Sequence, residues 1–311
     1  MHKVTGHWQR GFLLALITAL MWGVLPICLK VLLERMDAYT ITWYRFLVAS
    51  LLLGGFLVRK GRIPSLKGLS RNSWVLLVIA ILGLTGNYVV YLLGLVRVTP
   101  ETAQMVVQLA PMFLLLGGLV FYGELFHPKQ WVGLTLLIAG LLLFFNQRLE
   151  TPGGAGSDYY SGVALIVCSA AIWASYGMAQ KNLLTTFRSE ETLLVIYLAA
   201  VLILLPSAQL SQIWNLDTAG AVLLAFCCVN TVIAYGSFAE AMVHWEASRV
   251  SAVLATTPVI TLASVWILSD LVPGAIVPEK LNTLAFVGAF LAVAGSMLAA
   301  LGSRYSAPTT D

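Results

Sequence analysis

The feature that most constrains this chain is a series of ten apolar stretches, each close to the length of a helix that crosses a bilayer. A spanning helix needs about 20 predominantly apolar residues. Of the 311 residues, 59% are hydrophobic and only 10% are charged, whereas soluble domains carry about 25% charged residues. We expect spans at approximately 11–33, 40–58, 73–95, 100–122, 129–145, 161–183, 191–208, 218–240, 249–269 and 281–302.

The spans are predicted to be helices rather than the strands of a β-barrel. Barrel strands alternate apolar and polar residues, whereas a stretch such as 74–84 is apolar on every side. The predicted fold class is therefore an all-α polytopic membrane protein with ten transmembrane helices. It excludes a tethered soluble enzyme, a large ligand-binding ectodomain and a nucleic-acid-binding module, and it makes the lipid bilayer a partner of the chain.

The basic residues predict how the chain is inserted, because Lys and Arg favour cytoplasmic loops. With a cytoplasmic N-terminus, twelve lie inside and four outside. The twelve are Lys3, Arg10, Arg59, Lys60, Arg62, Lys67, Arg71, Lys129, Lys181, Arg188, Arg249 and Arg304, and the four are Arg35, Arg97, Arg148 and Lys280. We expect both termini in the cytoplasm and the protein in a bacterial-type inner membrane. This topology explains the formal charge of +4 without nucleic acid.

The two halves of the chain repeat each other. A shift of 151 aligns 19–22 with 170–173, and after a slip of four a shift of 147 aligns 94–111 with 241–258. Each half has five predicted spans, an odd number, so the second half must be inserted upside down relative to the first. Many carriers build an alternating-access path from such inverted repeats. We expect a first five-helix repeat at 11–145, an external linker at 146–160 and a second five-helix repeat at 161–302.

Several motifs give the chain a resemblance to a known family. They are Trp22-Gly23, Arg45, Asn87-Tyr88, Pro111, Gly123-Glu124, and Gln130 and Gly133 with Gly140. On these residues the chain resembles the EamA-type domain of the drug/metabolite transporter superfamily over roughly 11–302. The resemblance implies a ten-helix secondary carrier for a small-molecule substrate, commonly an exporter of amino acids or related metabolites.

Two tryptophans, Trp22 and Trp173, lie at matched depths about eleven residues into their spans. Tryptophan in membrane helices usually belongs to the interfacial belt, and an indole N–H that faces lipid would lack a partner, at about 1–3 kcal/mol. Packing between helices is one interpretation. Because both halves place the same residue at the same depth, we favour the other, in which both indoles line a substrate cavity.

Three basic residues lie near the ends of spans. Lys30 and Arg45 are expected near the external ends of the first two spans, about 5 and 8 Å deep at 1.5 Å per residue, and Lys181 is the cytoplasmic counterpart of Lys30. Each could instead snorkel to water or belong to a loop. Together they predict a positive external vestibule that favours a carboxylate or phosphate, with one cation at each mouth of the path.

The fourth and ninth spans carry predicted gating residues. Gln104, Gln108 and Pro111 share one helical face, and Pro258 is the counterpart of Pro111. A proline leaves the carbonyl four residues earlier without its helical partner, which membranes tolerate only where protein or water satisfies it. Structural kinks explain the prolines equally well, but two glutamines on one face favour a binding surface. Pro26 of the first span is the third predicted kink or gating position.

Amide and phenol side chains complete the candidate cavity. Helix-to-helix hydrogen bonds are the alternative role for such groups. If they line the cavity, it is aromatic and amide-rich with few fixed charges, which suits zwitterionic or amphipathic metabolites. The candidates are Asn87, Tyr88, Tyr91, Tyr176 and Tyr235.

Other chemistries are not indicated. The acidic residues lie at span ends or in loops, so a buried carboxylate that couples transport to an ion is not expected. The histidines lie outside the spans and no metal-ligand spacing or phosphate-binding loop occurs, so no catalytic residue, metal or cofactor is predicted. The glycines at 133, 140, 288 and 295 predict close helix packing, within the bundle or at a homodimer contact.

The predicted function is therefore a secondary transporter that moves small polar or amphipathic metabolites by alternating access. A flippase for lipids or lipid-linked metabolites with the same fold is the main alternative. A channel and a membrane-embedded enzyme are more remote, because no charge ring, filter-like loop or set of catalytic groups lies at membrane depth.

Overall fold

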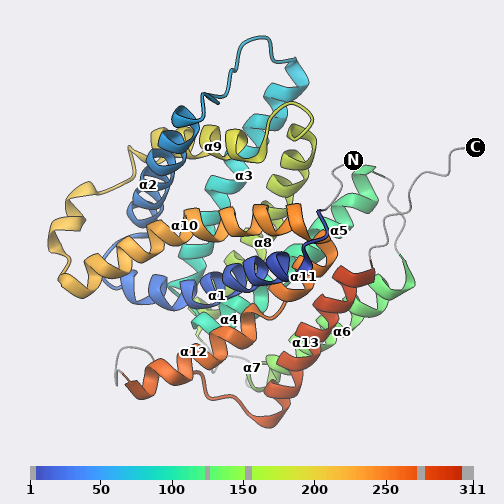
Figure 1. The fold of residues 1–311 in the computed structure, drawn as a ribbon. Coiled ribbons are helices and arrows are strands. Elements are labelled where there is room, and N and C mark those ends of the chain that lie inside the picture. Colours follow the sequence, from blue (N-terminus) through green and yellow to red (C-terminus); the bar gives the residue numbers. More distant parts are fainter. Residues whose placement is uncertain (1–4, 123–126, 151–155, 272–276, 303–311) are drawn as a thin grey trace, which may run out of the picture.

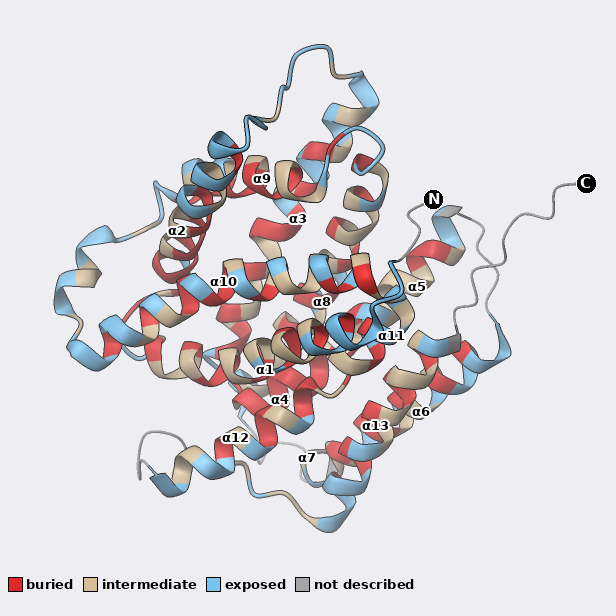
Figure 2. Cartoon of the chain, in the orientation of Figure 1, coloured by how far each residue is buried: buried red, intermediate tan, exposed pale blue. Residues whose placement is uncertain are grey.

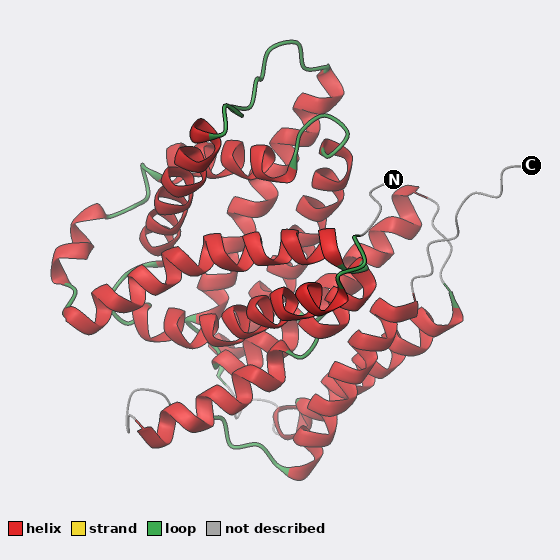
Figure 3. Ribbon diagram, viewed as in Figure 1, coloured by secondary structure: helices red, strands yellow, loops and turns green. Residues whose placement is uncertain are grey.

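The computed structural model describes residues 5–122, 127–150, 156–271 and 277–302. Within these ranges the chain is helical with short connections and no strand (Figure 3). The helices are α1 (Trp8–Leu32), α2 (Ala38–Arg59), α3 (Arg71–Leu95), α4 (Pro100–Val107), α5 (Leu109–Tyr122), α6 (Pro128–Phe144), α7 (Asn146–Glu150), α8 (Ser157–Leu183), α9 (Ser189–Leu204), a 3₁₀ helix (Leu210–Asn215), α10 (Thr218–His244), α11 (Ala247–Leu254), α12 (Thr257–Leu271) and α13 (Thr283–Gly302).

Eight helical segments in these ranges are long and apolar enough to cross a membrane. Six are the single helices α1, α2, α3, α8, α10 and α13, and two are consecutive pieces, α4 with α5 and α11 with α12. The other two expected spans form helices of 17 and 16 residues, α6 and α9, shorter than the about 20 residues of a typical span. The all-helical membrane class is confirmed, and the number of ten spans stays a prediction.

The outside of the bundle carries large apolar side chains and its interior holds polar groups; Figure 2 shows which residues are exposed and which are buried. Leu51, Val120, Phe121, Leu202 and Phe290 are each 66–73% exposed. Soluble proteins rarely expose apolar surface on this scale, whereas a lipid environment accepts it. The buried polar residues include Thr18, Arg45, Gln104, Gln108 and Asn230.

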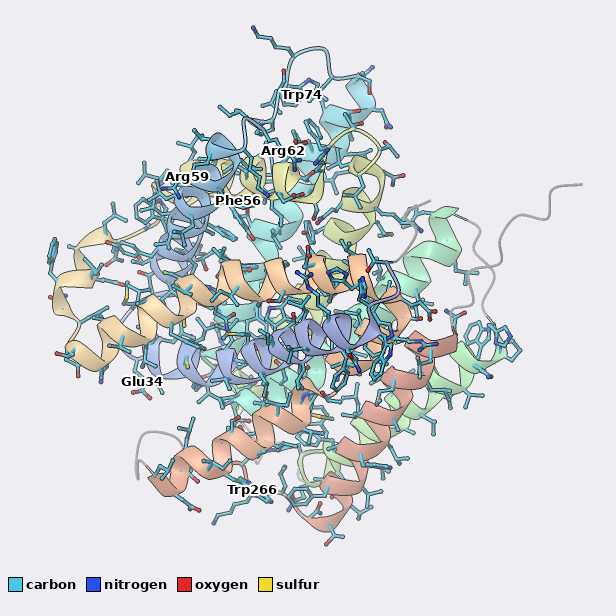
Figure 4. All side chains as sticks on the ribbon, viewed as in Figure 1. Glu34, Phe56, Arg59, Arg62, Trp74 and Trp266 are labelled. Atoms are coloured by element: carbon cyan, nitrogen blue, oxygen red, sulfur yellow. The ribbon has the colours of Figure 1, made fainter. Side chains whose placement is uncertain are left out.

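Side-chain caps set where several helices begin. The carboxylate of Asp37 accepts hydrogen bonds from the backbone N of Tyr39 and Thr40, at 2.9 and 3.0 Å, and so caps α2. The hydroxyl of Thr99 caps α4, with Pro100 at its first position. Figure 4 shows Glu34, just before the start of α2, well apart from Arg59 at the end of α2, so the apolar part of α2 lies between two charged positions.

Helices far apart in sequence pack in pairs: α1 with α10, α2 with α9, α3 with α8, and α6 with α13. Figure 1 shows the first and last of these pairs. Between α6 and α13 the backbones touch. A Cβ on Gly140 would lie 2.3 Å from the backbone N of Ala292, and one on Gly288 would lie 2.4 Å from that of Phe144. The glycines therefore serve close packing within one chain.

Two membrane segments are broken at equivalent places. α4 and α5 are separated at Gln108, and α11 and α12 at Ala255 and Thr256. Each break comes just before a proline, Pro111 or Pro258, which cannot donate to the carbonyl four residues earlier. A helix break therefore precedes Pro111 and Pro258, next to the cavity described below, whereas Pro26 lies inside the unbroken helix α1.

Candidate functional site

A cavity of about 430 Å³ lies in the middle of the bundle, within the 300–1,000 Å³ typical of ligand pockets. Residues from α1, α2, α3, α4, α5, α8, α10, α11, α12 and α13 line it, together with residues at the two helix breaks. Both halves of the sequence therefore contribute to its wall. The site residues predicted from the sequence that line it are Trp22, Pro26, Arg45, Asn87, Tyr88, Tyr91, Gln104, Gln108, Pro111, Trp173 and Tyr235.

The two matched tryptophans both reach this cavity, Trp22 from α1 and Trp173 from α8. The indole of Trp22 also packs edge-on against the Tyr235 ring, with centroids 5.4 Å apart, and against Phe238 at 5.8 Å. The two interpretations of Trp22 are thus compatible, because one face of an indole can pack while the other faces the cavity. The result is an aromatic wall on this side of the cavity.

Arg45 is the charged residue of the cavity. It lies seven residues into α2, about 10 Å along the helix at 1.5 Å per residue, and it is 2% exposed. Its Nε donates to the Thr231 hydroxyl at 3.1 Å, and the guanidinium carbon lies 4.5 Å from the centroid of the Tyr88 ring. The expectation that Arg45 could snorkel to external water is wrong, because α10 and the cavity surround it.

The two helix breaks are joined across the cavity by Gln108. Its amide nitrogen donates to the carbonyl oxygen of Ala255 at 2.8 Å, and its amide oxygen accepts from the hydroxyl of Ser296 at 3.4 Å. Ala255 lies at the second break, so a side chain at one break satisfies a carbonyl at the other. Gln104, one turn earlier on α4, lines the cavity and is 5% exposed.

The amide of Asn87 both lines the cavity and holds two helices together. Its nitrogen donates to the carbonyl and the hydroxyl of Ser169 on α8, at 3.0 and 2.8 Å. The helix-to-helix hydrogen bond, the alternative stated above, is therefore present. Asn87 is held in place by α8, and its neighbours Tyr88 and Tyr91 also border the cavity.

Four predicted site residues are not part of this wall. The Lys30 ammonium donates to the carbonyl oxygens of Leu95, Val96 and Val98, at 2.8, 2.7 and 2.9 Å, where α3 ends. Tyr176 is buried in the cluster around Phe46 and Tyr197. Lys181 is exposed in the last turn of α8, and Pro258 is buried in the first turn of α12.

Several lining residues were not predicted from the sequence. Phe238 and Met242 follow Tyr235 by about one and two turns of α10, so helical periodicity was a sufficient signal for them. Ser251 and Thr257 had a signal in the repeat, because Ser251 is Gln104 shifted by 147 and Thr257 adjoins Pro258. Ser296 carries no such signal, because small hydroxyl residues are common throughout membrane helices.

A buried carboxyl cluster was also missed. Glu101, at the second position of α4, is 1% exposed, and one of its oxygens accepts from the backbone N of Glu279 at 3.2 Å. The Glu279 carboxylate accepts from the hydroxyls of Thr99 and Thr102, at 2.7 and 2.8 Å, and lies 3.5 Å from Arg148. Both acids lie at a span end, as expected, but they are buried there because the segment before α13 covers the start of α4.

The sequence profile of one family matches the chain twice. The EamA-like transporter family matches residues 9–146 and again residues 160–301. The two matches together take in all the lining residues of the cavity.

Relatives cover nearly the whole chain. An "Uncharacterized transporter" of Haemophilus influenzae is 38% identical over 94% of this chain and 95% of its own length. The "Uncharacterized inner membrane transporter YhbE" of Escherichia coli K12 is 39% identical over 94% of this chain and 92% of its own length. A more distant relative, the "Probable amino-acid metabolite efflux pump" of Escherichia coli K12, is 22% identical over 96% of this chain and 97% of its own length.

A solved structure shares the fold. It is titled "Crystal structure of protein", superposes with a TM-score of 0.66 and 19% identity, and covers 97% of this chain and 99% of its own. At this identity the likeness concerns the fold alone.

Proposed function

This chain belongs to the EamA-like transporter family, and we propose that it is a secondary transporter that moves small polar or amphipathic metabolites through the central cavity by alternating access. A transport role follows from the family and from the relatives that are named transporters. The substrate class follows less directly. Amino acids and related compounds are the first to test, since a relative at 22% identity is named a probable amino-acid metabolite efflux pump.

One observation carries the proposal. The cavity is enclosed by both halves of the chain, and matched positions of the two halves, Trp22 with Trp173 and Tyr88 with Tyr235, line it together. Carriers with internal repeats place their sites at the interface of the repeats. A cavity of about 430 Å³ there has the size and position of a metabolite site.

Equivalent contacts support an inverted repeat of 11–145 and 161–302. The Ser169 hydroxyl donates to the carbonyl of Asn87 and the Thr18 hydroxyl to that of Ala234, both at 3.3 Å. Ser169 is Thr18 shifted by 151, and Ala234 is Asn87 shifted by 147. The same interhelical bond therefore occurs in α3–α8 and in α1–α10, as a two-fold relation between the halves requires.

A second pair of contacts follows the same relation. A Cβ on Gly162 would lie 2.8 Å from a Val98 side-chain carbon, and one on Gly11 would lie 2.5 Å from a Trp245 side-chain carbon. Gly162 is Gly11 shifted by 151, and Trp245 is Val98 shifted by 147. We infer ten membrane helices on this basis, with α6 and α9 as the two short ones and residues 146–160 as the external linker.

The orientation is inferred from the loops. Twelve Lys and Arg on one side against four on the other support a cytoplasmic position for both termini. The name of the Escherichia coli relative at 39% identity supports an inner-membrane location. With this orientation the carboxyl cluster of Glu101 and Glu279 lies at the external end.

The placement of the polar groups favours a metabolite carrier over a lipid flippase. A flippase needs a polar path that opens sideways toward lipid. Here Arg45, Gln104 and Gln108 are each 5% exposed or less and line the central cavity, while the outer surface of the bundle carries large apolar side chains.

Counterflow in proteoliposomes tests the proposal. Vesicles are preloaded with a mixture of amino acids, their oxo and N-acyl derivatives and other small metabolites, and uptake of each labelled species is followed without an ion gradient. We expect transient, saturable accumulation of one class. If no species accumulates in a preparation shown to be folded, the exchange mechanism is wrong and a lipid assay follows.

A further inference from the structure

The guanidinium of Arg45 is a buried charge that, among the described residues, has one hydrogen-bond partner and one ring contact. The side chain is 2% exposed, and its Nε has one partner, the Thr231 hydroxyl at 3.1 Å. The two Nη nitrogens have no hydrogen-bond partner in the part of the chain that the structure describes. A guanidinium has five donors and stays protonated, so four of the five are left for another group.

No carboxylate compensates this charge. Within the described ranges no Asp or Glu lies within 4.0 Å of Arg45, and Arg45 is the sole charged residue among those that line the cavity. The phenols beside it, Tyr88 and Tyr91, are neutral at neutral pH. A buried charge without an ionic partner is strongly unfavourable, so the cavity attracts one negative charge.

The rest of the wall is apolar or neutral. Trp22, Trp173, Tyr235 and Phe238 supply aromatic surface, and Leu25 and Leu114 supply aliphatic surface. The neutral amides of Asn87 and Gln108 are already engaged, with Ser169 and with Ala255 and Ser296. No described lining group carries a negative charge that could pair with an ammonium.

We propose that Arg45 is the carboxylate receptor of this cavity, and that the preferred substrates are monoanions with one carboxylate and an apolar body but no free ammonium. Oxo acids, hydroxy acids and N-acyl amino acids have this chemistry. The carboxylate pairs with the two Nη nitrogens in the bidentate geometry typical of Arg, and the apolar body lies against the aromatic wall. A free amino acid must leave its ammonium without an ionic partner. This inference rests on the proposed function, because it assumes that the central cavity is the substrate site.

Binding measurements on the purified full chain test this selectivity. Isothermal titration calorimetry compares probes matched in size but not in charge, in two series. The first series is 3-phenylpropionate, phenylalanine and phenethylamine, and the second is 4-methyl-2-oxopentanoate, leucine and isopentylamine. We expect the anion to bind at least tenfold more tightly than the amine in at least one series, with the amino acid between them.

Two outcomes overturn the inference and differ in what they say of transport. If an amino acid binds more tightly than its anion, or if amino acids show counterflow while neither anion binds, the selectivity is wrong and the carrier function stands. If no probe binds and no metabolite shows counterflow, the proposed function fails as well.

Substitutions test whether Arg45 is the residue that binds the carboxylate of the anion. Arg45→Gln is expected to lower the affinity for the better anion at least tenfold and to abolish the difference between anion and amine, and Arg45→Lys to be intermediate, because it keeps the charge and loses the planar fork. Arg35→Gln is the matched control, since Arg35 pairs with Asp217 away from the cavity. If Arg45→Gln does not fold, the affinities for anion and amine are compared between Arg45→Lys and the wild-type protein. An unchanged anion preference in a folded Arg45 variant contradicts the inference.

Discussion

Arg45 and Lys30 are both cations inside membrane helices, but their surroundings differ. The ammonium of Lys30 donates to three carbonyls at the end of α3, which is all that its three donors can do. Arg45 donates to one hydroxyl through Nε and faces the cavity with the rest of its guanidinium. The donors of Lys30 are all engaged in hydrogen bonds within the protein, whereas most donors of Arg45 remain available to a ligand.

The difference explains why the two residues should respond differently to substitution. Lys30 donates hydrogen bonds to carbonyls that lack helical partners at the end of α3. It also places a favourable positive charge at the negative end of the α3 dipole. Arg45 makes one hydrogen bond to α10 and one ring contact to α3, and it provides the cavity with its charge. Stability should therefore depend on Lys30, and ligand affinity on Arg45.

The largest effect is expected for Lys30→Met. It leaves three carbonyls without their charged donor, and hydrogen bonds to charged groups contribute about 1.5–3 kcal/mol, so we expect a loss of roughly 2–3 kcal/mol of stability. A fall in the thermal unfolding midpoint of the purified protein measures it. Ligand affinity should stay within twofold. Lys67→Met, in the exposed loop between α2 and α3, is the control. If Lys30→Met kept the unfolding midpoint of the wild type but lost ligand affinity, Lys30 would be assigned to ligand binding rather than to stability.

A smaller effect is expected at the aromatic wall beside Arg45. A double variant in which Phe replaces both Trp22 and Trp173 loses indole surface worth about 0.5–1.5 kcal/mol per aromatic contact. Counterflow should need several-fold more substrate for half-maximal rate. Trp74→Phe with Trp266→Phe is the matched control, because both lie on the exposed surface. Unchanged kinetics in the Trp22 and Trp173 variant would remove the tryptophans from the site.

A still smaller effect is expected for Thr231→Val, which removes the Nε partner of Arg45. The hydroxyl contributes one hydrogen bond, about 1 kcal/mol, through the orientation of the guanidinium. We expect a loss of two- to tenfold in anion affinity by calorimetry. Thr135→Val on the outside of α6 should change nothing. A change in unfolding midpoint without a change in affinity would assign Thr231 to packing alone.

The smallest effect is expected on the stability of Arg45→Gln. Removing a buried charge that has no ionic partner relieves its desolvation penalty, and Gln can still donate to Thr231. The unfolding midpoint should stay the same or rise slightly. A fall as large as that of Lys30→Met would show that Arg45 is as structural as Lys30, and the contrast between them would be lost.

The position of a residue within its own span was sufficient to predict features that depend on a single helix. The matched depth of Trp22 and Trp173 predicted that both reach a common cavity, and Pro111 and Pro258 predicted the two helix breaks. These inferences need only the position of a residue within its own span. The overall membrane class follows in the same way from the length and apolar character of the spans.

Features that depend on contacts between two distant segments could not be predicted from the sequence. Lys30 and Arg45 looked alike because both lie near span ends, and only the packing of α1 against the end of α3, 65 residues away, distinguishes them. The sequence located Glu101 at a span end and gave no sign of its burial, but Glu279, 178 residues away, covers it. Burial at a helix end is set by the partner segment, and one sequence does not reveal that partner.

The single positive charge at Arg45 also has an electrical consequence. In the proposed alternating-access mechanism, a bound anion makes the cavity neutral overall, so reorientation of the loaded carrier would move little charge through the membrane field. The empty carrier reorients with its positive charge exposed to a potential worth about 2.3 kcal/mol per elementary charge per 100 mV. Voltage should therefore act on net flux, which requires the return of the empty site, and leave one-for-one exchange nearly unaffected. The membrane potential, rather than a dedicated coupling ion, would then set the direction in which the substrate accumulates.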